Sequence, residues 1–222
     1  MRRIWRLLLA VVLVAGAMYL WRDFGRANTS GLERDAAGPM LRVRILGDSN
    51  DARIPAAREA IAYWNREFLR LGRRTHFDSG TVSPVKVQDE LLRAASKEAG
   101  SIFGRAPATS RLVKSMADEP ADIIVALSQT DLISFSVRWR SGSRGVVGVR
   151  RADIPPLSLP NTVRNVIAHE LGHVLGLDHN RDSTTLMCGR PAPCRPAAFA
   201  SESARFFPLT QADAGRLRAR WP

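Results

Sequence analysis

Cysteine and acidic residues are both scarce in this sequence. Two cysteines among 222 residues cannot cross-link a disulfide-dense mini-domain, so an ordinary apolar core must hold the fold. Hydrophobic residues make up 45% of the chain and charged residues 24%, which is the mixture of a soluble globular protein. This composition excludes a wholly disordered chain, a collagen-like repeat and a polytopic membrane protein.

The shortage of acids leaves the chain strongly basic. There are 21 acidic against 33 basic residues, which gives a formal net charge of +12. The first 22 residues hold four arginines and no acid, so the remaining chain carries 29 basic against 21 acidic residues, or +8. Such a charge favours anionic surfaces but is not by itself a signature of nucleic-acid binding, and we expect no nucleic-acid partner.

Residues 1–21 predict an export signal or a membrane anchor. Arg2, Arg3 and Arg6 precede an apolar run from Leu7 to Trp21, which is the order of a secretory signal. Ala15-Gly16-Ala17 would suit a signal peptidase, but the apolar run continues past it. A helix over residues 4–21 would span about 27 Å, close to the roughly 30 Å hydrocarbon core, so we favour an uncleaved anchor.

The charge of this segment also predicts location. Its positive end should stay in the cytoplasm, so the rest of the chain should be extracytoplasmic, either anchored by a single N-terminal helix or secreted. Residues 22–40 are polar and contain glycine, which is typical of a tether. Residues 41–222 then form the folded domain.

Hydrophobic periodicity predicts a mixed α+β domain. Strands are predicted at residues 41–46, 121–127, 133–140 and 146–154, the last two joined by a hairpin loop at 141–145. Helices are predicted at 55–71, more weakly at 85–99, from about Asn161 with Asn161 or Thr162 as its cap, and from Thr210 with Asp213 as its capping-box partner. Strands and helices do not alternate strictly, which favours an α+β fold or a mixed α/β sheet.

The stretch from His169 to His179 predicts a catalytic metal site. His169 and His173 are four residues apart on the predicted helix, so both imidazoles lie on one face, as two ligands of one zinc ion require. Gly176 can adopt a positive φ and end the helix, so that the chain turns back and presents His179. Three imidazoles leave a fourth position open for water, which is typical of a catalytic zinc site.

Glu170 completes this pattern. It projects about 100° round the helix from His169, where it can reach a water molecule without binding the metal itself. Its predicted role is that of a general base, and then of a general acid toward the leaving amine. A helix with core histidines and a surface glutamate is the alternative, but the only other histidine in the chain is His76.

The full pattern H-E-x-x-H-x-x-G-x-x-H resembles the metzincin zinc proteases, and within them the matrixin branch of the matrix metalloproteases. Met187 stands eight residues after His179, as the Met-turn methionine does in matrixins. The resemblance implies that Met187 forms a hydrophobic floor beneath the zinc. It also implies a twisted, mostly parallel sheet with an active-site helix and a C-terminal helix, which would begin at residues 207–213.

Three departures from the family pattern carry predictions. With only His76 outside the motif, we expect no structural zinc site, while calcium sites are not readable from the sequence. No cysteine precedes His169, so latency through a propeptide cysteine is absent. Cys188 and Gly189 follow Met187 where some metzincins have a tyrosine, so oxyanion stabilisation would rest on the metal and on backbone amides.

Cys188 and Cys194 lie in a proline-rich loop beside the predicted site. Outside the cytoplasm we expect them to form a disulfide, with a free Cys188 thiol near the zinc as the alternative. The resemblance implies that this loop walls the pocket for the substrate residue after the scissile bond.

The resemblance also implies that substrate peptides bind in an extended form along an edge strand, for which residues 133–140 are the candidate. Five arginines gather in this region: Arg138, Arg140, Arg144, Arg150 and Arg151. They are either a solvated face or the basis of a preference for acidic substrates or an anionic cell-envelope surface.

The sequence therefore predicts a zinc-dependent endopeptidase acting on protein or peptide substrates. Two alternatives stay open: a catalytically silent peptide-binding module on the same fold, and a zinc hydrolase of a non-peptide envelope bond. The cleavage preference and the oligomeric state are not predicted.

Overall fold

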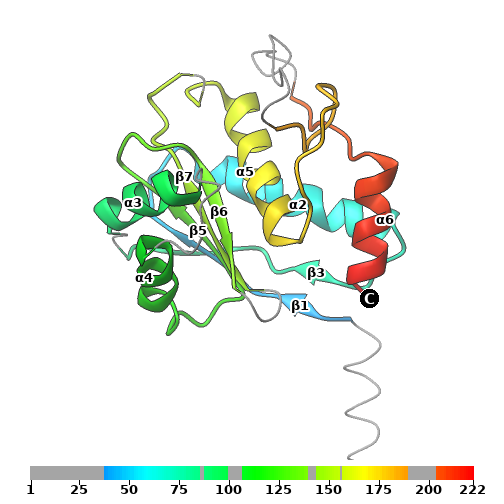
Figure 1. Cartoon of the computed structure of the whole chain (residues 1–222), viewed down its shortest axis with the longest axis horizontal. Helices are drawn as coiled ribbons and strands as arrows, with labels where there is room; N and C mark the ends of the chain where they lie inside the picture. The colour runs from blue at the N-terminus through cyan, green and yellow to red at the C-terminus, as the bar shows by residue number, and fades with distance from the viewer. Residues whose placement is uncertain (1–37, 86–87, 100–106, 140–143, 156, 190–203) are drawn as a thin grey trace, which may run out of the picture. The chain divides into compact units, whose positions relative to one another are not determined.

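The computed structural model describes residues 38–85, 88–99, 107–139, 144–155, 157–189 and 204–222 (Figure 1). Residues Met40–Pro222 cluster as one unit. The predicted anchor at 1–21, and the predicted tether at 22–40 up to residue 37, lie outside the described residues. No helix in the described part of the chain is long and apolar enough to cross a membrane.

A five-stranded sheet forms the centre of the fold, in the order β4-β2-β5-β7-β6. The strands are β2 (Val43–Leu46), β4 (Thr81–Ser83), β5 (Ile123–Leu127), β6 (Phe135–Arg138) and β7 (Gly145–Val149). Only β6 runs antiparallel to its neighbour. Every residue of β5 and β7 is buried, as expected for parallel strands covered on both faces. The predicted mixed fold with a mostly parallel sheet is confirmed.

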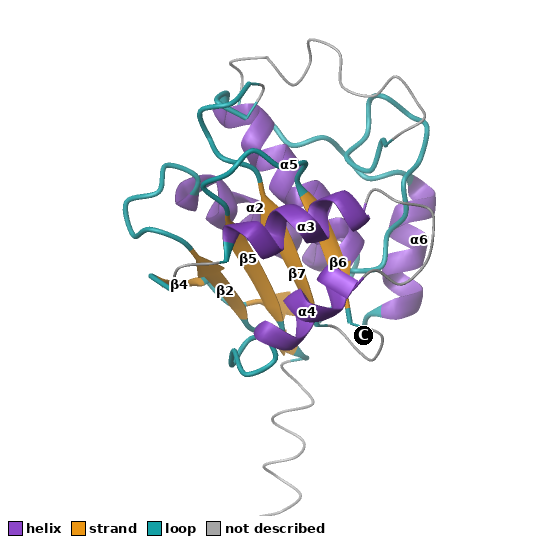
Figure 2. Cartoon of the chain, turned by 60° about the vertical axis from the view of Figure 1, so that its left-hand side comes forward, coloured by secondary structure: helices purple, strands orange, loops and turns teal. Residues whose placement is uncertain are grey.

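Helices cover both faces of this sheet. On one face lie α2 (Ile54–Arg70), α5 (Pro160–Val174) and α6 (Gln211–Arg220), and on the other lie α3 (Asp89–Ala99) and α4 (Pro107–Ser115), which are in front of the strands in Figure 2. Successive residues of a strand point to opposite faces. Accordingly Val125 belongs to the apolar cluster under α2 and α5, while Ile124 and Ala126 belong to the cluster under α3 and α4.

The predictions for α2 and α6 agree with the structure. The hydroxyl of Thr210 accepts a hydrogen bond from the Asp213 amide at 3.0 Å, and the Asp213 carboxylate accepts one from the Thr210 amide at 3.1 Å. This is the capping box that the sequence predicted. Leu217 and Trp221 of this C-terminal segment are buried in the main core.

The predicted cap of α5 was wrong. The helix begins at Pro160, one residue earlier, with Leu159 as the N-cap residue and no side chain capping it. Proline suits this first position because its missing N–H would have had no helical partner there. Asn161 and Thr162 are therefore inside the helix, and the Asn161 side chain accepts a hydrogen bond from the Arg205 amide instead.

The sequence did not predict several short elements, and it predicted some strands as longer than they are. Helix α4 was not predicted, and its first amides are bound by the Glu98 carboxylate of α3. The strands β1 (Met40–Leu41) and β3 (His76–Phe77) form a separate two-stranded sheet, so the predicted strand 41–46 breaks at Arg42. Two or three residues are too few to show a periodicity. Strands β6 and β7 are shorter than predicted, and residues 140–143 of their hairpin lie outside the described residues.

Candidate metal centre

Three histidines converge at the end of α5. His169 and His173 lie on the helix, and His179 lies in the loop that follows it. Their Nε2 atoms are 3.1, 3.1 and 3.0 Å apart. Zinc–nitrogen bonds of about 2.0–2.1 Å in a tetrahedron place their nitrogens about 3.3 Å apart. The three nitrogens therefore lie close to the spacing that one tetrahedral metal ion needs.

The other nitrogens of the two helical histidines are held by backbone. His169 Nδ1 is 2.7 Å from the Leu186 carbonyl oxygen, and His173 Nδ1 is 2.8 Å from that of Leu177. A carbonyl oxygen only accepts hydrogen bonds, so both Nδ1 atoms carry the proton. In a neutral imidazole the lone pair is then on Nε2, facing the centre of the group. This arrangement is the one required of metal ligands.

Gly176 makes the turn that separates His173 from His179. Its φ is +100°, in the left-handed region that residues with a Cβ rarely adopt. The Leu177 amide then donates to the Gly172 carbonyl at 2.9 Å. The same turn aims the Leu177 carbonyl back at His173, so one glycine ends the helix and helps to orient a histidine.

Met187 is fully buried beneath the helix. Its sulfur lies so close to Gly172 that a Cβ on that residue would be 2.5 Å away. The Asn180 amide donates to the Met187 carbonyl at 2.9 Å, which ties the segment after His179 to the segment around Met187. Met187 thus packs against α5 between the positions of His169 and His173.

Glu170 lies on the same helix with 8% of its surface exposed. Its Oε2 accepts a hydrogen bond from the hydroxyl of Ser136 at 3.0 Å. Ser136 belongs to β6, the strand at the edge of the described sheet, as the sequence predicted for this region. Sequence reasoning missed Ser136, because strand alternation can place it on a face but does not reveal which helical residue it meets.

Two further predictions concern cysteine and histidine. Cys188 is buried, and no cysteine in the part of the chain that the structure describes is free. Cys194 lies outside the described residues, so its pairing with Cys188 stays a prediction. His76 lies in β3, where its Nδ1 is 3.2 Å from the Arg74 carbonyl oxygen, and it is not part of the three-histidine group.

Three arginines of the predicted basic region are bound by local partners. Arg144 donates to the carbonyls of Ala121 and Glu119 and packs over Trp139. Arg150 forms an ion pair with Asp131, and Arg151 forms one with Asp153. Arg140 lies outside the described residues.

Arg138 differs from these arginines. Within the described ranges its guanidinium has no ion pair, and its Nη1 would be 3.0 Å from a Cβ on Gly176. It therefore lies beside the turn between His173 and His179. Arg220 of α6 approaches the same turn, with its Nε 3.1 Å from that Cβ position.

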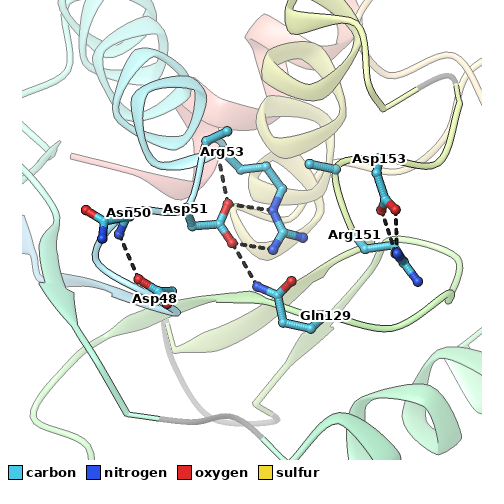
Figure 3. A pocket seen from close by; sticks show the side chains of 9 residues that line it. Asp48, Asn50, Asp51, Arg53, Gln129, Arg151 and Asp153 are labelled. Carbon is cyan, nitrogen blue, oxygen red and sulfur yellow. Dashed lines mark hydrogen bonds and ion pairs between the residues drawn. The ribbon is translucent and has the colours of Figure 1, made fainter.

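A hollow of about 440 Å³ is found elsewhere, at the ends of β2, β5 and β7 (Figure 3). Its polar groups bind one another. Asp51 receives hydrogen bonds from Arg53 and from Gln129, and Arg53 also donates to the carbonyls of Ser128 and Arg150. Burial by itself raises the pKa of Asp51, but the hydrogen bonds from Arg53 outweigh it and lower that pKa below its usual value. The hollow therefore contains a structural ion pair.

The chain matches the matrixin family over residues 68–200. It belongs to the matrixin family. As a matrixin it is a zinc metallopeptidase, a hydrolase that acts on protein or peptide substrates. The matched residues include the three histidines, which are a group able to hold the metal that this family implies. No curated protein matches the chain.

Three solved structures resemble this matrixin distantly. An archaemetzincin from Methanopyrus kandleri is 18% identical with a TM-score of 0.48, and the match covers 82% of this chain and 95% of that one. The archaemetzincin from Archaeoglobus fulgidus, complexed with malonate, is 16% identical with a TM-score of 0.45, covering 79% and 99%. A zinc-dependent peptidase from Methanocorpusculum labreanum is 12% identical with a TM-score of 0.39, covering 79% and 99%. At these scores the assignment rests on the matrixin match.

Proposed function

We propose that this matrixin is an endopeptidase that uses one catalytic zinc ion and Glu170 to hydrolyse peptide bonds. The observation that carries the proposal is the convergence of three Nε2 atoms within 3.1 Å of one another, two of them in rings whose Nδ1 is held by a carbonyl. Three imidazoles are a ligand set that zinc accepts, and they leave the fourth position open.

His169, His173 and His179 would hold the zinc through Nε2. When bound, the metal supplies Lewis acidity that polarises the scissile carbonyl and makes water acidic enough to attack near neutral pH. The Glu170 carboxylate accepts a proton from the attacking water and delivers it to the leaving amine nitrogen. Met187 supports the histidines from below. We expect one zinc per chain and no structural zinc, with calcium binding left open.

The N-terminal sequence supports an extracytoplasmic location. We propose that residues 1–21 act as a single-helix anchor or a cleaved signal, with residues 22–40 as the tether. The same location supports a disulfide between Cys188 and Cys194, since thiols outside the cytoplasm oxidise. This disulfide would rigidify the loop beside the metal centre.

We also propose that substrate peptides lie along β6 and that acidic residues in them are favoured. Arg138 supports this preference, because its charge lies on the edge strand beside the turn at Gly176, between His173 and His179. Arg144, Arg150 and Arg151 do not contribute, because carbonyls and carboxylates already bind them.

The test compares the full chain in detergent, wild type against Glu170→Gln, for zinc content and cleavage of casein. The glutamine is similar in size but cannot accept the proton, so about one zinc in both proteins and cleavage only by wild type is the expected result. Equal cleavage by both would remove Glu170 from the mechanism. Absence of zinc from wild type would remove the histidines as ligands.

Two other functions give different results in the same experiment. A catalytically silent peptide-binding module would bind zinc and peptide without turnover. A zinc hydrolase of a non-peptide envelope bond would leave casein intact but release soluble fragments from isolated envelope material in a zinc-dependent way. The glutamate beside His169 favours the endopeptidase over the silent module, since a module without catalysis has no need of it.

A further inference from the structure

The edge strand β6 presents one of its serines to α5. Phe135 and Val137 point toward the apolar cluster under α3 and α4, so the residue between them points to the opposite face. That residue is Ser136, whose hydroxyl donates to Oε2 of Glu170 at 3.0 Å. The bond joins two elements that are 34 residues apart in the sequence.

Both ends of this hydrogen bond are fixed by rigid structure. Ser136 is paired with Val147 of the buried strand β7, which sets its height along the sheet. On the other side, the indole of Trp64 donates to the Ala168 carbonyl at 2.9 Å and so ties α5 to α2, two residues before Glu170. A donor fixed in this way can define where the carboxylate stands relative to the helix.

The Glu170 carboxylate needs a partner that fixes its position. Its side chain has three rotatable bonds, and the carboxylate must meet a water molecule at one place. A hydrogen bond to a charged acceptor in a largely buried position is stronger than one in water. A carboxylate has two oxygens and about four acceptor sites, so one serine donor orients the group and leaves it able to accept a proton.

The serine two residues before Ser136 has a different role. Ser134 accepts a hydrogen bond from the Arg150 amide at 3.1 Å, which fastens the start of β6 to the end of β7. The Ser134 hydroxyl therefore binds the backbone at the edge of the sheet, whereas the Ser136 hydroxyl binds the Glu170 side chain. Ser134, directly before this strand, therefore provides a control.

We propose that Ser136 is a positioning residue that holds the Glu170 carboxylate in its working orientation. The proposal rests on the proposed function of Glu170. It also connects substrate binding to proton transfer, because the strand along which the peptide would lie carries the residue that orients the base.

The experiment measures kcat and KM on a peptide substrate, zinc content and thermal unfolding, using the full chain in detergent. The variants are Ser136→Ala, Ser136→Thr, Ser134→Ala and Glu170→Gln. We expect Ser136→Ala to lower kcat by about 10- to 100-fold, as loss of a residue that orients a catalytic group does. KM should change by less than about twofold and zinc should stay at one per chain. Threonine keeps the hydroxyl, so Ser136→Thr should restore most of kcat, and Ser134→Ala should keep it.

A wild-type kcat in Ser136→Ala would overturn the proposal. A lowered kcat that is fully explained by lost zinc or by unfolding of Ser136→Ala would also overturn it, and so would an equal fall of kcat in Ser134→Ala. If Ser136→Ala does not fold, Ser136→Cys takes its place, because a thiol is of similar size but a weak donor. Adding Ser136→Ala to Glu170→Gln should cause no further loss. Full activity of Glu170→Gln would instead overturn the proposed function itself.

Discussion

The backbone of Gly189 lies directly against the imidazole of His179. A Cβ on Gly189 would be 2.1 Å from Cδ2 of that ring and 2.5 Å from its Nε2, closer than real Cβ contacts come. The Gly189 amide donates to the Asn180 carbonyl at 3.2 Å, which holds the two segments together. The third histidine of the group is therefore positioned by the segment that follows Met187.

Gly189→Ala should displace His179 and weaken zinc binding. Because the ring must move to admit the methyl group, we expect zinc affinity to fall at least about tenfold, the loss typical when a ligand's support is disturbed. Competition with a chelator of known affinity measures the change. Gly215→Ala on α6 is the control, since nothing lies within 4 Å of a Cβ there. Wild-type zinc affinity in Gly189→Ala would contradict the prediction.

Asp51 and Arg53 should make the fold sensitive to acid. Their side chains are 5% and 2% exposed, and the pKa of Asp51 is lowered by its bonds to Arg53 despite its burial. A lowered pKa in the folded state adds stability that is present above the unfolded value of about 3.9 and is lost as the pH falls through the folded value. Unfolding in urea between pH 2 and pH 7 should show this loss below about pH 4.

Asp51→Asn should remove much of that acid dependence. It should also cost about 3 kcal/mol or more near neutral pH, because it leaves the buried Arg53 charge without its partner. Asp153→Asn, in the exposed pair with Arg151 at the same hollow, should leave stability unchanged (Figure 3). Equal effects of the two substitutions would show that burial of the pair is not the cause.

Arg138→Ala should reduce cleavage of acidic peptides selectively. Its guanidinium lies at the edge strand beside Gly176, so we expect kcat/KM to fall about tenfold for a peptide with acidic residues near the cleaved bond and little for a neutral analogue. The difference should shrink as salt rises, because salt screens exposed charges. Arg151→Ala is the matched control. Equal losses for both peptides would exclude a role in charge selection.

The predicted disulfide can be checked by thiol labelling of the denatured protein. With Cys188 and Cys194 paired, a maleimide reagent should modify no cysteine before reduction and two after it. Modification of both without prior reduction would show that they are free thiols and would support the alternative of a free Cys188 thiol near the zinc. Protein exported from the cell should therefore be labelled only after reduction, whereas protein made in a reducing cytoplasm should be labelled without it.

The sequence by itself determined which three histidines converge in the structure. His169, His173 and His179 lie within one helix and one turn, and such short-range geometry follows from helical periodicity and from a glycine that can adopt positive φ. The same locality explains why α2 and the capping box of α6 were predicted correctly. Met187 was named only through family resemblance, since its place beneath the helix depends on a longer loop.

Only the tertiary structure decided what surrounds these residues. The Leu186 carbonyl that orients His169, the Ser136 hydroxyl on Glu170 and the Gly189 backbone against His179 all join separate segments of the chain. A backbone carbonyl is the same in every residue, and a serine on a strand shows its face but not its partner. These contacts arise from packing β6 and the Met187 segment on α5, and packing between distant segments has no periodicity to read.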